Sequence, residues 1–234
     1  MRRGIRLLGT LLTVAGALTL IWALVVWRWQ DPFTALYTHW QQGKLTRAYE
    51  RRAADYRPRT AGSLAAERRM IAGEARDYRK TSRRGEGIGR IHVPRLGLDM
   101  TLVNGTDHET LKKGPGRDLR SFMPGENRLV YVAGHRTTYL APFSHIERLR
   151  PRDTITIEVP YGTFVYAVTG HRVVASTDLS VLRSPRHELL ELQACHPRFF
   201  ATHRYIALAR LVRVEPRGGT PYGAAPGAEA AGGS

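Results

Sequence analysis

Cys195 is the only cysteine in the chain, and its position favours a reactive thiol. A single cysteine cannot form an intramolecular disulfide, so its thiol is either a small buried apolar group or a nucleophile. Along the strand that is predicted to end at Cys195, Leu190, Leu192 and Ala194 alternate onto one face and Cys195 falls on the other. Pro197 then stops the strand. A strand end is rigid yet accessible, which suits a nucleophile.

His135 and Arg204 are the side chains that would act with this thiol. An apolar strand over residues 129–133 ends at Gly134 and delivers His135 into a polar turn. A cationic imidazole close to a thiol favours the thiolate and can then protonate a leaving amine. Arg204 opens another apolar strand, and its permanent charge fits a developing oxyanion. Taken alone, Arg204 fits a solvent-exposed arginine better.

Short strands must position these three residues. Beyond a linker at 81–87, the pattern changes to short apolar segments broken by Gly, Pro, Asn and Asp, with one short helix near 108–112. Strands of this length with regular turn signals favour an all-β barrel or sandwich. The predicted strands are 88–93, 98–103, 129–133, 154–159, 163–169, 171–175, 189–194 and 204–214.

At these residues the chain resembles the sortase family of cysteine transpeptidases, from about Gly87 to Val214. The similarity is greatest to class E sortases, which share a single N-terminal anchor and a Cys-His-Pro run. One position departs from the family, because Ala194 stands where Thr usually precedes the cysteine. The matched pieces are Pro124-Gly125-Glu126, Val132-Ala133-Gly134-His135-Arg136-Thr137-Thr138, Ala141-Pro142-Phe143, Leu192-Gln193-Ala194-Cys195-His196-Pro197 and Arg204.

The resemblance implies a closed eight-stranded β-barrel with His135, Cys195 and Arg204 at one end of a groove. It also implies that Cys195 attacks the Thr–Gly bond of a C-terminal LPXTG- or LAXTG-type sorting signal and forms a thioester. An amine, typically from a peptidoglycan precursor, would then release the thioester and leave the surface protein attached to the cell wall. No cofactor and no metal are expected. His196 and His203 fit no zinc spacing, and the acidic residues suggest no calcium site.

Other functions remain open at this point. A pilin-polymerising sortase is one, because Asp31-Pro32-Phe33 resembles the lid tripeptide of that class, although Asp31 and Pro32 also fit a helix start. An L,D-transpeptidase is the second alternative. That class has Gly directly before the cysteine, where Ala194 stands here, and His two residues before it, where Gln193 stands. A non-enzymatic, membrane-anchored β-domain with a buried Cys195 is the third possibility.

The N-terminal segment predicts a membrane anchor. Leu7 to Trp27 is an uncharged run that, as a helix, rises about 30 Å and so crosses a bilayer core. Arg2, Arg3 and Arg6 precede it, which places the N-terminus in the cytoplasm and the rest outside. A cleaved signal peptide is less favoured because the run ends in bulky residues. The net charge of +16 comes without a nucleic-acid-binding motif, so we expect no nucleic-acid partner.

The sequence therefore divides into four expected parts. Residues 1–28 form the cytoplasmic tail and transmembrane anchor, and residues 29–86 form a basic helical stalk that lifts the enzyme off the membrane. Residues 87–215 form the catalytic domain. Residues 216–234 form a disordered tail rich in Gly, Ala and Pro.

Overall fold

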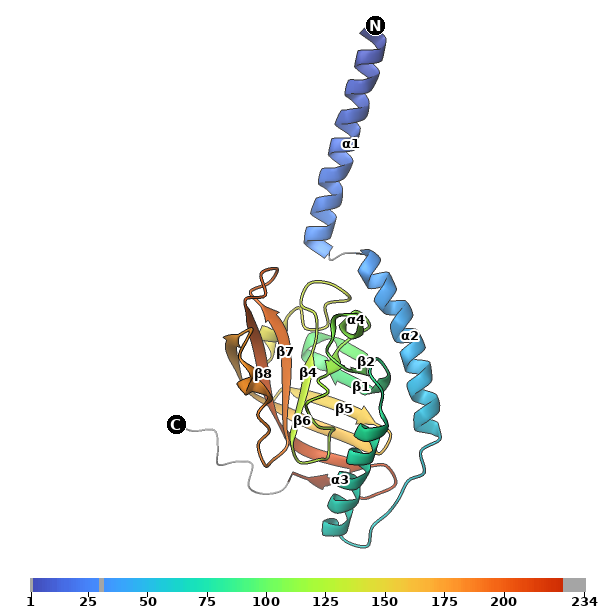
Figure 1. Ribbon diagram of the computed structural model, residues 1–234, viewed down its shortest axis with the longest axis vertical. Coiled ribbons are helices and arrows are strands. Elements are labelled where there is room, and N and C mark those ends of the chain that lie inside the picture. Colours follow the sequence, from blue (N-terminus) through green and yellow to red (C-terminus); the bar gives the residue numbers. More distant parts are fainter. Residues whose placement is uncertain (1, 30–31, 225–234) are drawn as a thin grey trace.

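Three helices precede a β-barrel in the computed structural model, which describes residues 2–29 and 32–224 (Figure 1). The helices are α1 (Arg2–Trp29), α2 (Pro32–Ala54), α3 (Leu64–Thr81) and α4 (His108–Leu111), with 3-10 turns η1 (Pro94–Leu96), η2 (Ile146–Arg148) and η3 (Leu179–Leu182). The strands are β1 (Gly87–Val93), β2 (Leu98–Asn104), β3 (Gly116–Arg117), β4 (Leu129–Ala133), β5 (Thr154–Val159), β6 (Gly162–Ala175), β7 (Leu189–His196), β8 (His203–Pro216) and β9 (Tyr222–Gly223).

The strands close into a barrel because β6 pairs with both β5 and β8. The sheet order is β6-β5-β1-β2-β3-β4-β7-β8-β9, and the β6–β8 pairing joins the two sides. β9 pairs only with β8, so eight of the nine strands form the ring. The expected closed eight-stranded barrel is confirmed, although the strands differ in detail. β6 is one strand with a register shift between Val168 and Gly170, where two were predicted, and the two-residue β3 was not predicted.

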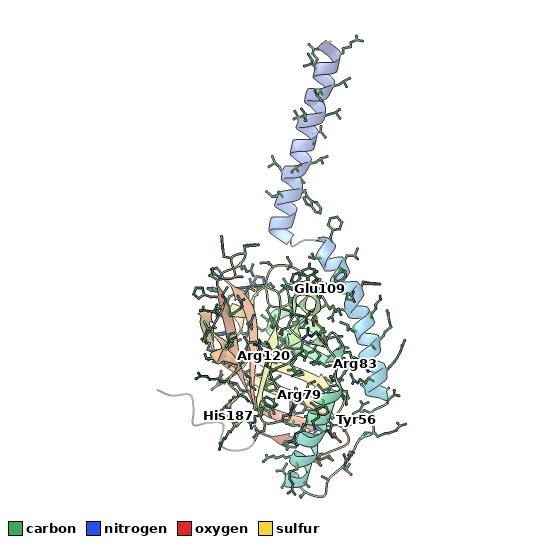
Figure 2. All side chains as sticks on the ribbon, viewed as in Figure 1. Tyr56, Arg79, Arg83, Glu109, Arg120 and His187 are labelled. Carbon is green, nitrogen blue, oxygen red and sulfur yellow. The ribbon has the colours of Figure 1, made fainter. Side chains whose placement is uncertain are left out.

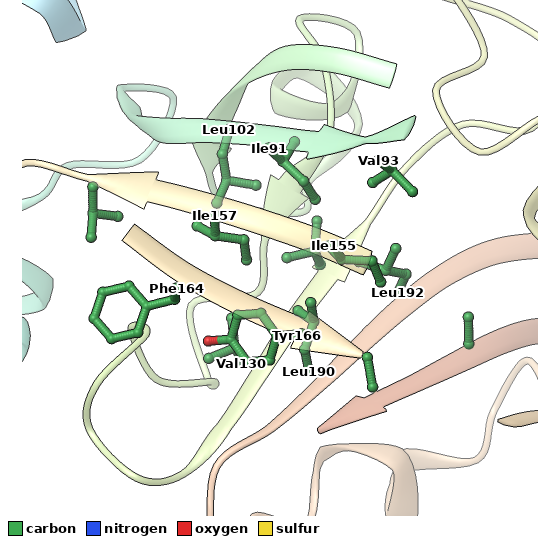
Figure 3. Close-up of a cluster of buried hydrophobic side chains, with 14 of the residues drawn as sticks. Ile91, Val93, Leu102, Val130, Ile155, Ile157, Phe164, Tyr166, Leu190 and Leu192 are labelled. Carbon is green, nitrogen blue, oxygen red and sulfur yellow. The ribbon is translucent and has the colours of Figure 1, made fainter. Parts of the chain in front are cut away.

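Alternating apolar side chains fill the barrel (Figure 3). Ile155 and Ile157 of β5 point inward and are fully buried, as are Leu190 and Leu192 of β7. Burying a side chain of this size stabilises the fold by about 1.5–3 kcal/mol. The same alternation on β7 places Ala194 in the core and Cys195 on the opposite face.

α1 is the one helix of the described residues that is long and apolar enough to cross a membrane. The candidate span runs from Arg3 to Leu24 and none of it is buried. Its side chains stand clear of the barrel (Figure 2). The expected N-terminal apolar helix is therefore present in the structure.

α2 and α3, which make up most of the expected helical stalk, lie along the barrel. Ile71 and Ala75 of α3 belong to the main core. α2 docks through polar side chains: Gln42 Nε2 donates to the carbonyl oxygens of Thr101 (3.1 Å) and Lys113 (2.7 Å), and its Oε1 accepts from the Thr101 N–H at 2.7 Å. The stalk was expected because a polar helix usually faces solvent, whereas here its polar residues bind backbone groups of the barrel.

Residues 216–224 of the expected disordered tail are ordered, which corrects this part of the prediction. β9 extends the sheet beyond β8, with Tyr222 opposite Val214. The Tyr222 ring is half-buried and packs against the core. Residues 225–234 of the expected disordered tail, and Asp31 of the expected helix cap, lie outside the described residues.

Gln42→Ala should lower the free energy of unfolding by about 1–3 kcal/mol, because it leaves buried backbone groups without partners. Chemical denaturation of the full chain in detergent measures this. Gln41→Ala is the matched control, because Gln41 bonds only the Tyr37 hydroxyl of its own helix. Equal stability of the two variants would mean that α2 is not docked in solution.

Candidate active site

β4, β7 and β8 bring the three predicted residues to one end of the barrel. β4 and β7 run parallel, with Ala133 opposite Gln193, so His135 and Cys195 each lie two residues beyond that pair. The Gly134 N–H donates to the Gln193 carbonyl at 3.0 Å and extends this register. β8 runs antiparallel to β7 and places Arg204 directly opposite Cys195. Paired residues on neighbouring strands share a face of the sheet.

Cys195 and Arg204 open into the same cavity, of about 290 Å³. Gln193 and Tyr131 line it from β7 and β4, and the Tyr131 hydroxyl donates to Gln193 Oε1 at 3.0 Å. η3 supplies an apolar wall. A larger cavity of about 500 Å³ lies beside the C-terminal end of α2, but neither cysteine nor histidine lines it. The smaller cavity is therefore the candidate site.

Asp118 and Arg120 form a charged edge of this cavity that the sequence reasoning missed. Figure 2 labels Arg120. The buried Asp118 carboxylate accepts from the backbone N–H, Nε and Nη2 of Arg120 at 2.8–3.0 Å, and from the Thr106 hydroxyl at 3.1 Å. The Arg120 side chain is 61% exposed, so it presents positive charge beside the cavity. No spacing in the sequence marked this pair.

His135 lies beside the cavity rather than in its lining. The Gly134 backbone packs against Phe143 so closely that a Cβ would come within 2.6 Å of the ring. The Phe143 N–H also donates to the His135 carbonyl at 3.1 Å. Nε2 of His135 is buried and has no hydrogen-bond partner among the described residues. No described residue therefore competes for this nitrogen.

Burial lowers the pKa of His135 below its ordinary value of 6.5, and the charges of His108 and Lys112 lower it further. The rings of Tyr139 and His108 lie 5.1 and 6.5 Å from the His135 ring. The neutral imidazole therefore predominates at neutral pH and can accept a proton.

Arg136 connects the histidine loop to the cysteine strand, a role that the sequence did not indicate. Its Nη1 donates to the Cys195 carbonyl at 3.1 Å and lies 2.9 Å from His196 Nδ1. Its Nη2 donates to Glu147 at 2.8 Å. The guanidinium is almost fully buried, so the residue next to His135 holds the strand end that carries Cys195.

The two arginines near Cys195 point in different directions. Arg204 Nη1 donates to the carbonyls of Ala201 (2.8 Å) and His203 (3.0 Å), which fixes its guanidinium at the start of β8. Arg198 instead donates to the Ser144 carbonyl and does not line the cavity. Ala194 faces the core, so the family's usual Thr at this position would not reach the cavity along this strand.

Among the described residues, no three His, Cys, Asp or Glu side chains gather in an arrangement that could hold an ion.

Comparison with known proteins gives one consistent family. The Sortase domain family model matches residues 91–212. Sortase D of Bacillus subtilis (strain 168) is 30% identical over 133 residues, which are 55% of this chain and 65% of that protein. Sortase SrtE1 of Streptomyces coelicolor is 28% identical over 149 residues, which are 57% of this chain and 42% of that protein. The chain therefore spans less than two thirds of both relatives.

A solved structure shows the same fold. The Sortase D5 transpeptidase of Clostridium perfringens superposes with a TM-score of 0.60 at 22% identity. The match covers 74% of this chain and 98% of that one.

NMR titration of the full chain in detergent should place the pKa of His135 below 6.5, with His135→Gln identifying its signal. Lys112→Gln should raise this pKa because it removes a nearby positive charge, whereas Lys113→Gln should leave it unchanged. Since the unfolded chain binds this proton more readily, the contribution of His135 to stability should fall as the pH drops below about 6.5. A pKa above 6.5 would contradict the burial of this imidazole, and equal shifts from both lysine variants would contradict the effect of the Lys112 charge.

Proposed function

This chain belongs to the sortase family of cysteine transpeptidases, and we propose that it joins surface proteins to a cell-wall amine. The proposed reaction cuts an LPXTG- or LAXTG-type sorting signal between Thr and Gly. The observation that carries the proposal is the shared cavity of Cys195 and Arg204, with His135 at the same end of the barrel.

In the first half-reaction, Cys195 is the nucleophile. Neutral His135 accepts the thiol proton, and the sulfur attacks the carbonyl carbon of the signal's Thr. Arg204 stabilises the negative oxygen of the tetrahedral intermediate. When the C–N bond breaks, the imidazolium of His135 gives its proton to the leaving Gly amine, and the Thr acyl group remains on sulfur as a thioester.

In the second half-reaction, an acceptor amine attacks the thioester. His135 takes the proton that the amine loses, Arg204 again faces the oxyanion, and the sulfur leaves and regains its proton. A new amide bond replaces the thioester, so no external energy source is needed. The unpartnered Nε2 of His135 supports this role, because a buried nitrogen without a partner is ready to bond an incoming amine or thiol.

The proposed location is the cell membrane, with the barrel outside. The arginines before the apolar part of α1 favour a cytoplasmic N-terminus. Surface proteins with sorting signals and a peptidoglycan precursor, or another amine, are the proposed partners. Pilin polymerisation has less support, because neither Pro32 nor Phe33 lines the cavity.

Arg204→Ala should lower kcat/KM for a sorting-signal peptide by about 10²–10³-fold, the usual scale for one oxyanion donor. Arg198→Ala is the matched control and should change kcat/KM little, since its guanidinium binds Ser144 outside the cavity. Cys195→Ala and His135→Ala should each abolish turnover. Full activity of Cys195→Ala would overturn the proposal and favour a non-enzymatic domain, and a larger loss from Arg198→Ala would reassign the oxyanion role.

A further inference from the structure

The start of α2 ties the candidate site to the membrane surface. α1 ends at Trp29 and α2 begins at Pro32, so the two helices are at most about 11 Å apart along the chain. The Phe33 ring lies 5.6 Å from that of Trp22, which belongs to the apolar span. The first turn of α2 therefore lies where α1 leaves the bilayer.

The same turn of α2 contacts the loop that carries His135. The Tyr139 N–H donates to the Thr34 hydroxyl at 3.2 Å, and the rings of Tyr139 and Tyr37 are 6.5 Å apart. The Tyr139 ring is in turn 5.1 Å from the His135 ring. One aromatic residue thus separates His135 from a helix that starts at the membrane.

Large apolar side chains are exposed on this end of the molecule. On α2, Phe33 (71% exposed), Leu36 (70%) and Trp40 (55%) lie on the solvent-facing side of the helix. On the loop between β7 and β8, Phe199 is 73% exposed and Phe200 is 78% exposed. Figure 1 shows this loop and the start of α2 at the end of the barrel nearest α1.

The charge around the two phenylalanines suits an anionic surface. The segment 196–204 contains Arg198 and Arg204 and no acidic residue, so its net charge is positive even though both guanidiniums also bond backbone carbonyls. Aromatic rings settle in the interfacial region of a bilayer, and nearby arginines are attracted to anionic headgroups. Exposed apolar patches of this kind mark interaction sites.

We propose that Phe199 and Phe200, together with the exposed face at the start of α2, dock the active-site end of the barrel onto the bilayer. The partner of this surface is the lipid interface into which α1 is inserted. A lipid interface is favoured over a soluble protein because the surface is continuous with the α1 anchor. Docking would hold the Cys195 cavity near the membrane surface. This position of the cavity would favour sorting signals that are still tethered to the membrane over signals free in solution, an inference that rests on the proposed function.

A depth measurement tests the docking directly. The full chain with Cys195→Ala and Phe200→Cys carries an environment-sensitive fluorophore in nanodiscs of phosphatidylcholine with phosphatidylglycerol. We expect a blue-shifted emission that is quenched by lipids with spin labels near the headgroup. Leu64→Cys is the control, because this exposed side chain begins α3 at the opposite end of the molecule. Equal quenching at both positions, or a blue shift that depends on protein density, would overturn the proposal, the latter in favour of self-association.

A kinetic measurement separates docking from catalysis. Phe199→Ser with Phe200→Ser should slow transfer from a lipid-tethered signal peptide by about tenfold, as expected for losing part of the burial of two aromatic rings. Cleavage of the same peptide free in solution should be unchanged, as should both reactions of Leu64→Ser. Equal rates of the double variant and the parent chain on the tethered peptide would overturn the docking. Absence of cleavage in the parent chain would instead overturn the proposed function.

Discussion

The parallel pairing of β4 with β7 is the interaction on which the candidate site depends. Parallel strands end at the same edge of a sheet, so the residues that follow Ala133 and Gln193 emerge together as His135 and Cys195. Antiparallel pairing of β7 with β8 adds Arg204 opposite the cysteine. Arg136 reinforces the arrangement, because its buried guanidinium bonds the Cys195 carbonyl. A one-residue slip in either register would turn Cys195 into the core.

α2 packs on the barrel rather than standing apart from it. α2 binds backbone groups of the barrel through Gln42, and its first turn meets the loop of His135 through Tyr139. Thr34 and Tyr37, near the start of α2, thereby contact the loop that carries His135, the proposed general acid and base. The position of α2 on the barrel is therefore coupled, through Tyr139, to the position of the His135 ring.

Local patterns in the sequence predict much of this structure, but they do not predict contacts between residues that are far apart in the chain. Period-two alternation correctly separates Leu192 and Ala194 from Cys195, because burial on one face of a strand is a local property. The docking of Gln42 and the bond from Arg136 to Cys195 could not be predicted, since each joins residues 59 positions apart. β3 was missed because two residues carry no periodicity. The closed barrel was predicted from the family resemblance, because alternation alone did not distinguish a barrel from a sandwich.

Covalent capture of a substrate fragment on Cys195 would show directly that this thiol is the nucleophile. The full chain is incubated with an LAXTG-type peptide, and the intact protein is then measured by mass spectrometry. We expect an added mass equal to the peptide fragment that ends in Thr, located on Cys195, released by hydroxylamine and lost faster when an amine acceptor is added. Peptide cleavage without this adduct, or an adduct that persists in Cys195→Ala, would show that Cys195 is not the nucleophile.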